Sequence, residues 1–422
     1  MIKGEKIRLD IHNILYTIFK SNKNLKSTSI EKIINKHKRE DISFLNNVIL
    51  NSMRYHIHIE KIINSHIKKK LRDHEKILLL SSITQIVFLN FKEYAVINCS
   101  VEIAKKFKIY HGLINATLKK ISRNKNYLKN TKINFIDLPL WFRNETKYFS
   151  ENERNKFIKS ISQEPHLHIV FKSEKKLFNC KEKIIKTSSL SGFLESKTNI
   201  TNINSFKNGD WWVQDFSSFF PIYNLPTKKK YKKILDTCAA PGGKAFQILS
   251  QEINITLNDI NKNKIRILES NLKRLNFQTE ILNKDFTKFR FKEKYDCIII
   301  DAPCSAIGTI RKNPEIFFKM EGPNFNELIK VQEKMLDKAS QLLNKGGLIL
   351  YMVCSFLRRE TESQINNFLK KKTDFKLYNF KLEKQNSNYN KLIKDNFMIT
   401  LPDNIMKKNI DGYFAAYLEK IK

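Results

Sequence analysis

Two cysteines in the C-terminal half each follow an apolar segment and stand where a thiol could do covalent chemistry. Cys304 lies in "DAPCS", shortly after Asp301, and Cys354 ends "GGLILYMVC". A single cysteine of this kind is usually a packed small hydrophobic side chain. Two thiols at neighbouring strand ends, beside a carboxylate, instead suit covalent catalysis on an unreactive carbon. C5 of cytosine is such a carbon, because a thiolate that adds at C6 makes C5 nucleophilic.

A glycine-containing turn, "LDTCAAPGGK", follows another apolar segment. Gly242 and Gly243 allow the backbone to approach a ligand closely, and a helix is expected to begin near Lys244. This geometry suits a nucleotide-like ligand. A phosphate-binding P-loop is excluded, because Cys238 stands where that motif needs glycine and Ala245 where it needs a hydroxyl.

Three aspartates stand at the expected ends of strands. Asp259 ends the second strand, about 20 residues past the glycine turn, where a carboxylate can accept both hydroxyls of a ribose. Asp285 follows the third strand, and alone it would be interpreted as a turn or helix-capping residue. Asp301 ends the fourth. Ligands of open α/β sheets gather at the carboxyl ends of strands, so the three together indicate a binding site there.

Few other types of catalytic residue are present in the C-terminal half. All nine histidines lie at or before His168, so a histidine-based nucleophile scheme is excluded in the C-terminal half, and proton handling is left to carboxylates, thiols, Lys244 or water. The six cysteines form no CxxC pair, which predicts neither a metal site nor a disulfide framework. Cys99 and Cys297 are interpreted as core residues.

The distribution of glycine and proline divides the chain into three parts, whose helices and strands must position these residues. Residues 1–140 hold no proline before Pro139 and repeat apolar residues at helical spacing, which predicts an all-α bundle. Residues 141–228 alternate short strands with polar loops and predict a small mixed α/β module. Residues 229–422 alternate strand and helix patterns, which predicts a parallel, helix-covered α/β sheet.

The net charge of the 422-residue chain indicates which classes of binding partner are favoured. Lys and Arg number 77 against 42 Asp and Glu, a formal net charge of +35, which favours a polyanion such as nucleic acid, although AT-rich coding could impose the same bias. The longest apolar stretch, 77–91, is too short and too polar to span a bilayer and predicts a buried helix. No signal peptide is evident. We expect a cytoplasmic protein that does not bind membranes.

Several motifs together resemble one enzyme family. "LDTCAAPGGK", "DAPCSAIG" followed by "RKNPEI", and "YMVCS" are similar to motifs of the RNA cytosine-5 methyltransferases of the NOL1/NOP2/Sun group, and most of all to its RsmB (Sun, Fmu) branch, which acts on 16S ribosomal RNA. "GLINATLKKI", "WWVQDFSSFF" and "DGYFAAYLEK" extend the resemblance over nearly the whole chain. It implies a NusB-like RNA-binding bundle, an RNA-contacting mixed module and a Rossmann-like class I methyltransferase domain.

The resemblance also implies roles for individual residues. The turn would wrap the methionine portion of S-adenosylmethionine, Asp259 would hold its ribose, and Asp285 would lie near its adenine. Asp301 would lie beside the methyl donor and the target base, with Lys244 among the catalytic groups. Cys354 would attack the base, and Cys304 would assist release of the product. The residues of the turn are Cys238, Ala239, Ala240, Pro241, Gly242, Gly243 and Lys244.

The implied substrate is a cytidine in a single-stranded loop of 16S ribosomal RNA, because a base leaves a loop at lower cost than a duplex. The RNA could be naked or part of an assembling small subunit, and a monomer is expected. Val353 and "FLRRET" depart from the Thr, Pro and Glu-Asn that commonly flank the nucleophile in the family. Two alternatives stay open: a tRNA cytosine-5 methyltransferase, and a non-catalytic RNA-binding or assembly protein with a decayed methyltransferase domain.

A tryptophan pair and a basic segment each have two interpretations. Trp211 and Trp212 could stack on RNA bases or form a hydrophobic lock between domains. The basic segment "KKKYKK" at 228–233 could hold phosphates or be a solvated linker.

Overall fold

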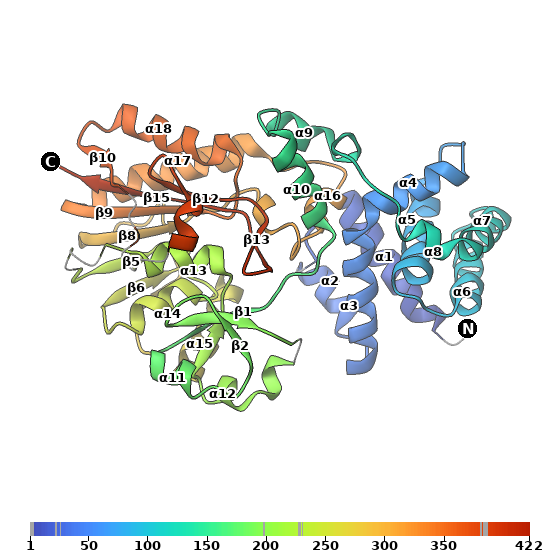
Figure 1. The fold of residues 1–422 in the computed structure, drawn as a ribbon, viewed down its shortest axis with the longest axis horizontal. Helices are drawn as coiled ribbons and strands as arrows, with labels where there is room; N and C mark the ends of the chain where they lie inside the picture. Colours follow the sequence, from blue (N-terminus) through green and yellow to red (C-terminus); the bar gives the residue numbers. More distant parts are fainter. Residues whose placement is uncertain are drawn as a thin grey trace. The chain divides into compact units, whose positions relative to one another are not determined.

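The chain forms two compact units. The computed structural model describes residues 4–21, 23–25, 27–196, 199–226, 229, 231–379, 382 and 387–422. The helical unit comprises residues 1–163 and 310–323, and the α/β unit comprises residues 164–309 and 324–422. Figure 1 shows the two units as ribbons.

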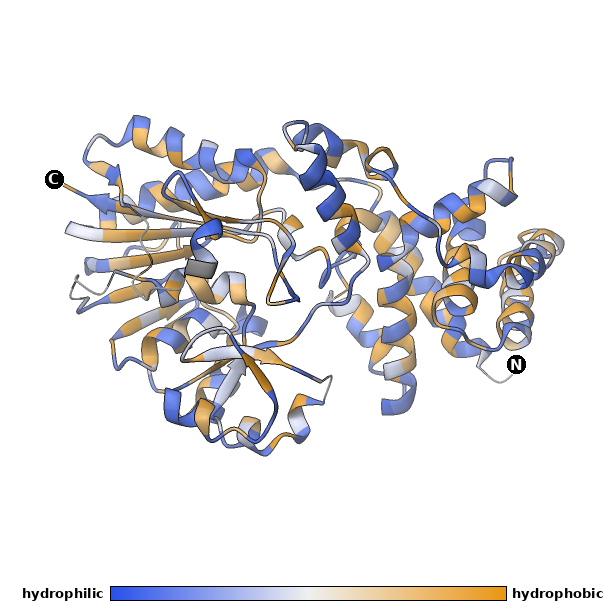
Figure 2. Ribbon diagram, in the orientation of Figure 1, coloured by the Kyte–Doolittle hydropathy of each residue, from blue (hydrophilic) through white to orange (hydrophobic). Residues whose placement is uncertain are grey.

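The helical unit is a bundle built from amphipathic helices. In α1, Ile7, Ile11, Ile14 and Ile18 recur at three and four residue spacing and are buried in the core. Hydrophobic and hydrophilic residues alternate along these helices in Figure 2. The helices are α1 (Glu5–Ser21), α2 (Thr28–Ile34), α3 (Arg39–Arg54), α4 (His56–His66), α5 (Asp73–Ile83), α6 (Glu93–Lys106), α7 (His111–Arg123), α8 (Lys125–Leu128), α9 (Leu140–Glu145), α10 (Glu151–Ile161) and α16 (Glu315–Phe318).

The helical unit extends beyond the boundary that the sequence predicts at residue 140. Pro139 is the N-cap residue of α9, so this first proline of the chain marks the start of a helix. Phe142 of α9 stacks on Phe157 of α10, with ring centroids 4.7 Å apart, and both are buried. Residues 141–163 therefore pack with the bundle, and the division into units falls after Gln163.

A segment from the second half of the sequence completes the helical unit. Residues 310–323 contain α16, and Phe318 packs against Phe19 of α1 with ring centroids 5.6 Å apart. Arg54 Nη2 donates a hydrogen bond to the carbonyl oxygen of Arg311, 3.3 Å away. The sequence patterns placed this segment, which contains "RKNPEI", in the methyltransferase domain.

No described helix is long and apolar enough to cross a membrane. Within the apolar stretch at 77–91, α5 continues into a π-helical turn, Thr84–Phe88, and residues 77–87 are buried in the bundle. This confirms the prediction that the stretch forms a buried helix.

A small antiparallel sheet begins the α/β unit. Its order is β2-β3-β1-β4, and α11 (Glu174–Phe178) and α12 (Asn204–Lys207) accompany it. Trp211 and Trp212 of β4 are buried, so neither offers a face to RNA. Trp212 packs edge-on against Phe246, which joins this sheet to the larger core. The strands are β1 (His168–Phe171), β2 (Ile184–Lys186), β3 (Ser191–Leu194) and β4 (Trp211–Val213).

The large sheet has a parallel centre, as the sequence predicts, in the order β7-β6-β5-β8-β9. Strand β15 runs antiparallel to β9, and β12, β11 and β10 extend that edge. The bounds are β5 (Ile234–Asp236), β6 (Ile255–Asn258), β7 (Ile281–Leu282), β8 (Tyr295–Asp301), β9 (Leu343–Val353), β10 (Phe375–Leu377), β11 (Ile393–Lys394), β12 (Phe397–Thr400) and β15 (Tyr413–Lys420), with a separate hairpin of β13 (Asp403–Ile405) and β14 (Lys408–Ile410).

Helices cover both faces of the large sheet. On one face the core includes residues of α13 (Phe216–Tyr223), α14 (Gly243–Leu249) and α15 (Lys262–Leu275); on the other it includes residues of α17 (Phe325–Leu342) and α18 (Glu362–Lys371). Strand β8 is apolar without interruption because Ile299 faces the first core while Ile298 and Ile300 face the second. This doubly covered sheet confirms the predicted Rossmann-like fold and brings five strand ends to one edge.

Candidate active site

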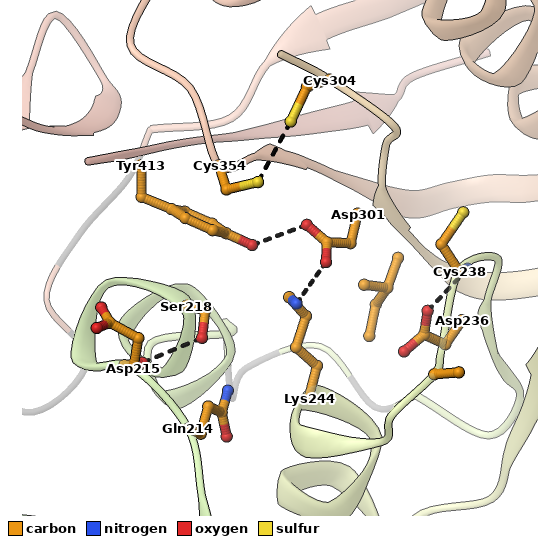
Figure 3. Close-up of polar contacts among 12 residues, drawn as sticks. Gln214, Asp215, Ser218, Asp236, Cys238, Lys244, Asp301, Cys304, Cys354 and Tyr413 are labelled. Carbon is orange, nitrogen blue, oxygen red and sulfur yellow. Dashed lines mark hydrogen bonds and ion pairs between the residues drawn. The ribbon is translucent and has the colours of Figure 1, made fainter. Parts of the chain in front are cut away.

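The carboxyl ends of the parallel strands present acidic and thiol side chains at one edge of the sheet. Asp236 ends β5, Asp259 follows β6 and Asp301 ends β8. Asp301 pairs in register with Met352, so the end of β8 lies beside Cys354, which follows β9. Figure 3 shows Asp301 in contact with Lys244, and Cys354 in contact with Cys304.

The two cysteines singled out from the sequence are in direct contact. Cys304 Sγ and Cys354 Sγ lie 3.3 Å apart (Figure 3), and the backbone N–H of Gly308 donates to the Cys354 carbonyl at 3.0 Å. The hydrogen bond with Cys354 and then burial raise the pKa of the Cys304 thiol well above its usual value. Cys304 therefore keeps its proton and can donate it in a hydrogen bond to a thiolate at Cys354.

Asp301 is held on both of its oxygen atoms. Lys244 Nζ lies 2.6 Å from Oδ2, and the Tyr413 hydroxyl donates to Oδ1 at 2.8 Å (Figure 3). Burial lowers the pKa of Lys244, but the charge and hydrogen bond of Asp301, with Asp236 and Cys354, outweigh it and raise that pKa overall. Lys244 is therefore an ammonium group whose field reaches the thiol pair.

Tyr413 was not among the residues that the sequence assigned to the site. It begins β15, and Phe414 pairs with Val353, so the antiparallel strand starts at the edge where the parallel strands end. Burial, and then the charge of Asp301, raise the pKa of Tyr413 well above its usual value, so its hydroxyl stays protonated and donates. The available signal was topological: an antiparallel neighbour of β9 must begin at this edge.

The glycine turn forms a narrow cradle after β5. Gly242 has φ +115°, and a Cβ atom there would collide with the ring of Phe246. The backbone N–H of Cys238 donates to Asp236 Oδ1 at 3.2 Å, and that of Ala240 donates to Asp259 Oδ2 at 3.2 Å. Burial, and then Asp236, raise the pKa of the Cys238 thiol to about 12, so Cys238 is a neutral lining group of the cradle.

Asp236 has one carboxylate oxygen, Oδ2, that is buried and has no hydrogen-bond partner in the described part of the chain. Burial raises the pKa of this carboxyl group to about 7. A buried, unsatisfied oxygen beside the cradle fits the ammonium group of a ligand with an amino-acid portion, since unpaired buried polar atoms are costly. Asp236 lies in the motif "LDTCAAPGGK", but the sequence analysis gave it no role.

Asp259 and Asp285 differ in how they are held. Asp259 is almost fully buried, and its Oδ1 accepts the N–H of Asn261 at 2.8 Å. Asp285 Oδ1 accepts the N–H and the hydroxyl of Thr287, at 3.0 and 2.6 Å, and the hydroxyl bond is the main cause of its lowered pKa. Asp285 thus closes a turn after β7, and its suggested place near the adenine stays a prediction.

Other residues singled out from the sequence lie outside this constellation. Lys229 of the basic segment donates to the Gly346 carbonyl at 2.7 Å and pairs with Glu419 at 2.6 Å, while Lys228 and Lys230 lie outside the described residues. Cys99 and Cys297 are buried, as expected of core residues. In the described ranges there is no group of three or more His, Cys, Asp or Glu that could hold a metal ion.

The sheet order, the cradle after β5 and the acidic strand ends define a class I methyltransferase, whose methyl donor is S-adenosylmethionine. Residues 224–419 match the family of the 16S rRNA methyltransferase RsmB/F, and residues 5–123 match the NusB family. Over these ranges the chain matches the models of the two families, as its motifs led us to expect.

Individual relatives agree with this assignment. The ribosomal RNA small subunit methyltransferase B of Shewanella oneidensis is 27% identical over 350 residues, which cover 78% of this chain and 81% of that protein. The solved structure of PH0851 has the same fold across 100% of this chain and 99% of its own, with a TM-score of 0.71 and 20% identity. The NSun6 structure from Pyrococcus horikoshii with SFG covers 67% of this chain and 98% of its own, with a TM-score of 0.56 and 18% identity.

Proposed function

We propose that this protein methylates C5 of a cytidine in 16S ribosomal RNA through a covalent bond between Cys354 and C6 of the base. The observation that carries the proposal is the contact of two thiols beside a lysine–aspartate pair at the cofactor edge of the sheet. The RsmB/F family match and the names of the relatives support the substrate class.

Cys354 is the proposed nucleophile. A thiolate that adds to C6 places electron density on C5, and the ammonium group of Lys244 stabilises negative charge near the attacking sulfur. The Cys304 thiol donates to that sulfur and can orient it before attack. Asp301, whose oxygens are fixed by Lys244 and Tyr413, offers an acceptor for the donor groups of a cytosine.

Cys304 is the proposed release residue. After C5 has gained a methyl group, the C5 proton must leave before the C6–sulfur bond can break and regenerate the Cys354 thiolate. Cys304 Sγ lies 3.3 Å from the Cys354 sulfur and so stands beside the adduct. Once the Cys304 thiol has released its own proton to water, its thiolate can accept the C5 proton.

The cradle and its neighbours would hold S-adenosylmethionine, which when bound supplies an electrophilic methyl group on a sulfonium. Asp236 would receive the ammonium group of its methionine portion, and Asp259 the ribose hydroxyls. Residues Cys238 to Lys244 would line the methionine portion, and Asp285 would lie near the adenine. Support for Asp236 comes from its unsatisfied buried oxygen.

We further propose that the target lies in a single-stranded loop and that the helical unit and the small sheet bind the flanking RNA. Support comes from the NusB match over residues 5–123 and from the net charge of +35, which attracts phosphates. An assembling small subunit as substrate, a monomeric state and a cytoplasmic location belong to the same proposal.

Mapping of 5-methylcytosine in ribosomal and transfer RNA from cells with and without the gene tests this function. One 16S cytidine should lose its methyl group in the deletion strain and regain it with the wild-type gene but not with Cys354→Ala. Loss of a methylcytosine from transfer RNA alone would replace ribosomal RNA as the substrate. Unchanged methylation of both would contradict the proposal.

A further inference from the structure

The loops that carry the two cysteines share one buried carboxylate, Glu360. Ser305 follows Cys304 directly, and its N–H and hydroxyl donate to Glu360 Oε1 and Oε2 at 2.7 and 2.5 Å. Ser355 follows Cys354 directly, and its hydroxyl donates to the same Oε2 at 2.6 Å. One side chain therefore holds the residue next to each thiol.

Glu360 is itself fixed in place. It has no exposed surface, and the Tyr351 hydroxyl donates to its backbone carbonyl at 2.9 Å. Gln332 Nε2 of α17 lies 3.4 Å from Oε1, which gives the carboxylate four donors. In the described part of the chain no cation pairs with Glu360, so these hydrogen bonds must offset the cost of burying its charge.

A backbone hydrogen bond and a contact between side chains also join the two loops. Gly308 N–H donates to the Cys354 carbonyl, and the hydroxyls of Ser305 and Ser355 lie 3.3 Å apart. Among the described residues, the Glu360 carboxylate accepts from both loops at once, through bonds of the strong, charge-assisted kind. It can therefore set the distance between the thiols more firmly than either serine alone.

We propose that Glu360 is a positioning residue that holds Cys304 and Cys354 in register with each other. It touches neither thiol and acts through Ser305 and Ser355. The catalytic consequence rests on the proposed function, whereas the geometric consequence does not.

The closing experiment measures the geometry without RNA, in the full-length protein. A thiolate of one cysteine displaces one glutathione from oxidised glutathione, and the second cysteine then displaces the other, which yields a Cys304–Cys354 disulfide and two molecules of reduced glutathione. If the second thiol is badly placed, the mixed glutathione disulfide persists. The ratio of the two products, read by peptide mass spectrometry, therefore reports the effective concentration of one thiol at the other.

The wild-type chain should give mainly the internal disulfide. Glu360→Gln should lower the ratio about tenfold, because loss of the charge weakens contacts to both loops and small misplacements of reacting groups cost up to about 100-fold. Ser305→Ala and Ser355→Ala, which each remove one hydroxyl, should lower it less. Glu419→Gln, at the far end of β15, is the matched control and should leave it unchanged.

Two outcomes overturn the proposal: a wild-type chain that accumulates only mixed disulfides, and a Glu360→Gln chain that binds S-adenosylmethionine normally and keeps the wild-type ratio. If Glu360→Gln does not fold, the two serine variants decide in the same way. A lowered ratio in a protein that methylates no cytosine contradicts the proposed function but supports the role of Glu360.

The kinetic readout then separates the two loops. Ser355→Ala should slow formation of the covalent adduct, because it loosens the attacking thiol. Ser305→Ala should slow release, so that the adduct accumulates. Both variants should bind S-adenosylmethionine as the wild type does. Equal slowing of both steps by either serine variant would contradict separate control of the loops.

Discussion

The helical unit and the α/β unit both bury titratable side chains, but they arrange them in opposite ways. In the helical unit, burial lowers the pKa values of His12 and His58 to about 4, so both rings are neutral at physiological pH. His12 Nε2 meets His74 Nδ1 at 2.9 Å, and both rings pack on Phe107. His12 lies in the core, and the His12 and His58 rings carry no charge.

In the α/β unit, partly buried groups of opposite charge converge from separate helices and strands. Asp301, Lys244, Tyr413 and Cys354 come from β8, α14, β15 and the end of β9, and they meet around one point. The comparison teaches that a shifted pKa in a buried group does not by itself indicate chemistry. A thiol, an ammonium group and a carboxylate that converge at the carboxyl ends of strands do indicate a catalytic site.

The largest expected difference between the units concerns their cysteines. Cys354→Ala should reduce methyl transfer by about 10⁴-fold or more, because loss of a nucleophile removes the covalent path. Cys99→Ala, which removes a buried thiol from the helical unit, should leave the rate within about threefold of wild type. Single-turnover assays with labelled cofactor measure both rates. Comparable losses of rate in the two variants would contradict the difference that we draw between the units.

Asp259→Ala should weaken the binding of S-adenosylmethionine by about tenfold to 100-fold, since hydrogen bonds to a charged group contribute about 1.5 to 3 kcal/mol. Asp337→Asn, a half-exposed carboxylate of α17, serves as the control and should bind normally. Titration calorimetry on folded variants checks this. Wild-type affinity for Asp259→Ala would remove its assignment to the ribose.

Tyr413→Phe should lower the rate of methyl transfer about tenfold, because it removes the hydrogen bond that holds Asp301 Oδ1. Affinity for the cofactor should change little, since Tyr413 lies on the side of the thiols in Figure 3. Rates and calorimetric affinities of the same preparation separate the two effects. Weaker cofactor binding at an unchanged rate would place Tyr413 in the cofactor site instead.

The remaining predicted effects are pH slopes of opposite sign, about 1.4 kcal/mol per pH unit for each group. The unfolded chain binds a proton at His12 between pH 6.5 and about 4 that the folded chain does not, so acidification through that range destabilises the helical unit. Asp236, with a pKa raised from 3.8 to about 7, binds its proton when folded. Asp236 therefore lowers the stability of the α/β unit as the pH rises from 3.8 to about 7.

Denaturant unfolding with pulse hydrogen exchange, which reports on the peptides of each unit, measures these slopes. His12→Asn should flatten the slope of the helical unit alone, and Asp236→Asn that of the α/β unit alone. Slopes of the same sign in both units would show that burial acts alike in the two cores.

Site residues that follow the parallel strands could be predicted from the sequence. Site residues that an antiparallel strand or the pairing of two strands brings to the edge could not. Asp259, Asp301 and Cys354 were found because each follows an apolar segment, and parallel strands end at one edge. Tyr413 was missed because only the antiparallel direction of β15 brings it there. Glu360 was missed because its partners, Ser305 and Ser355, are joined by the register of β8 and β9.

The same limit applies to the division of the chain. Composition separated a helical part from a sheet part, and the fold class followed from the alternation of strands and helices. The membership of residues 310–323 in the helical unit could not be predicted, because Phe318 finds its partner Phe19 about 300 residues away in sequence. Local patterns carry no information on such contacts.

The most direct test of the central claim is to trap the covalent intermediate. Each cysteine variant is mixed with substrate RNA and S-adenosylmethionine and then run on a denaturing gel. If Cys354 attacks C6 and Cys304 permits release, Cys304→Ala should give a slowly migrating protein–RNA band and Cys354→Ala should give none. A band with Cys354→Ala and none with Cys304→Ala would reverse the roles, and no band with either, despite wild-type turnover, would contradict the covalent mechanism.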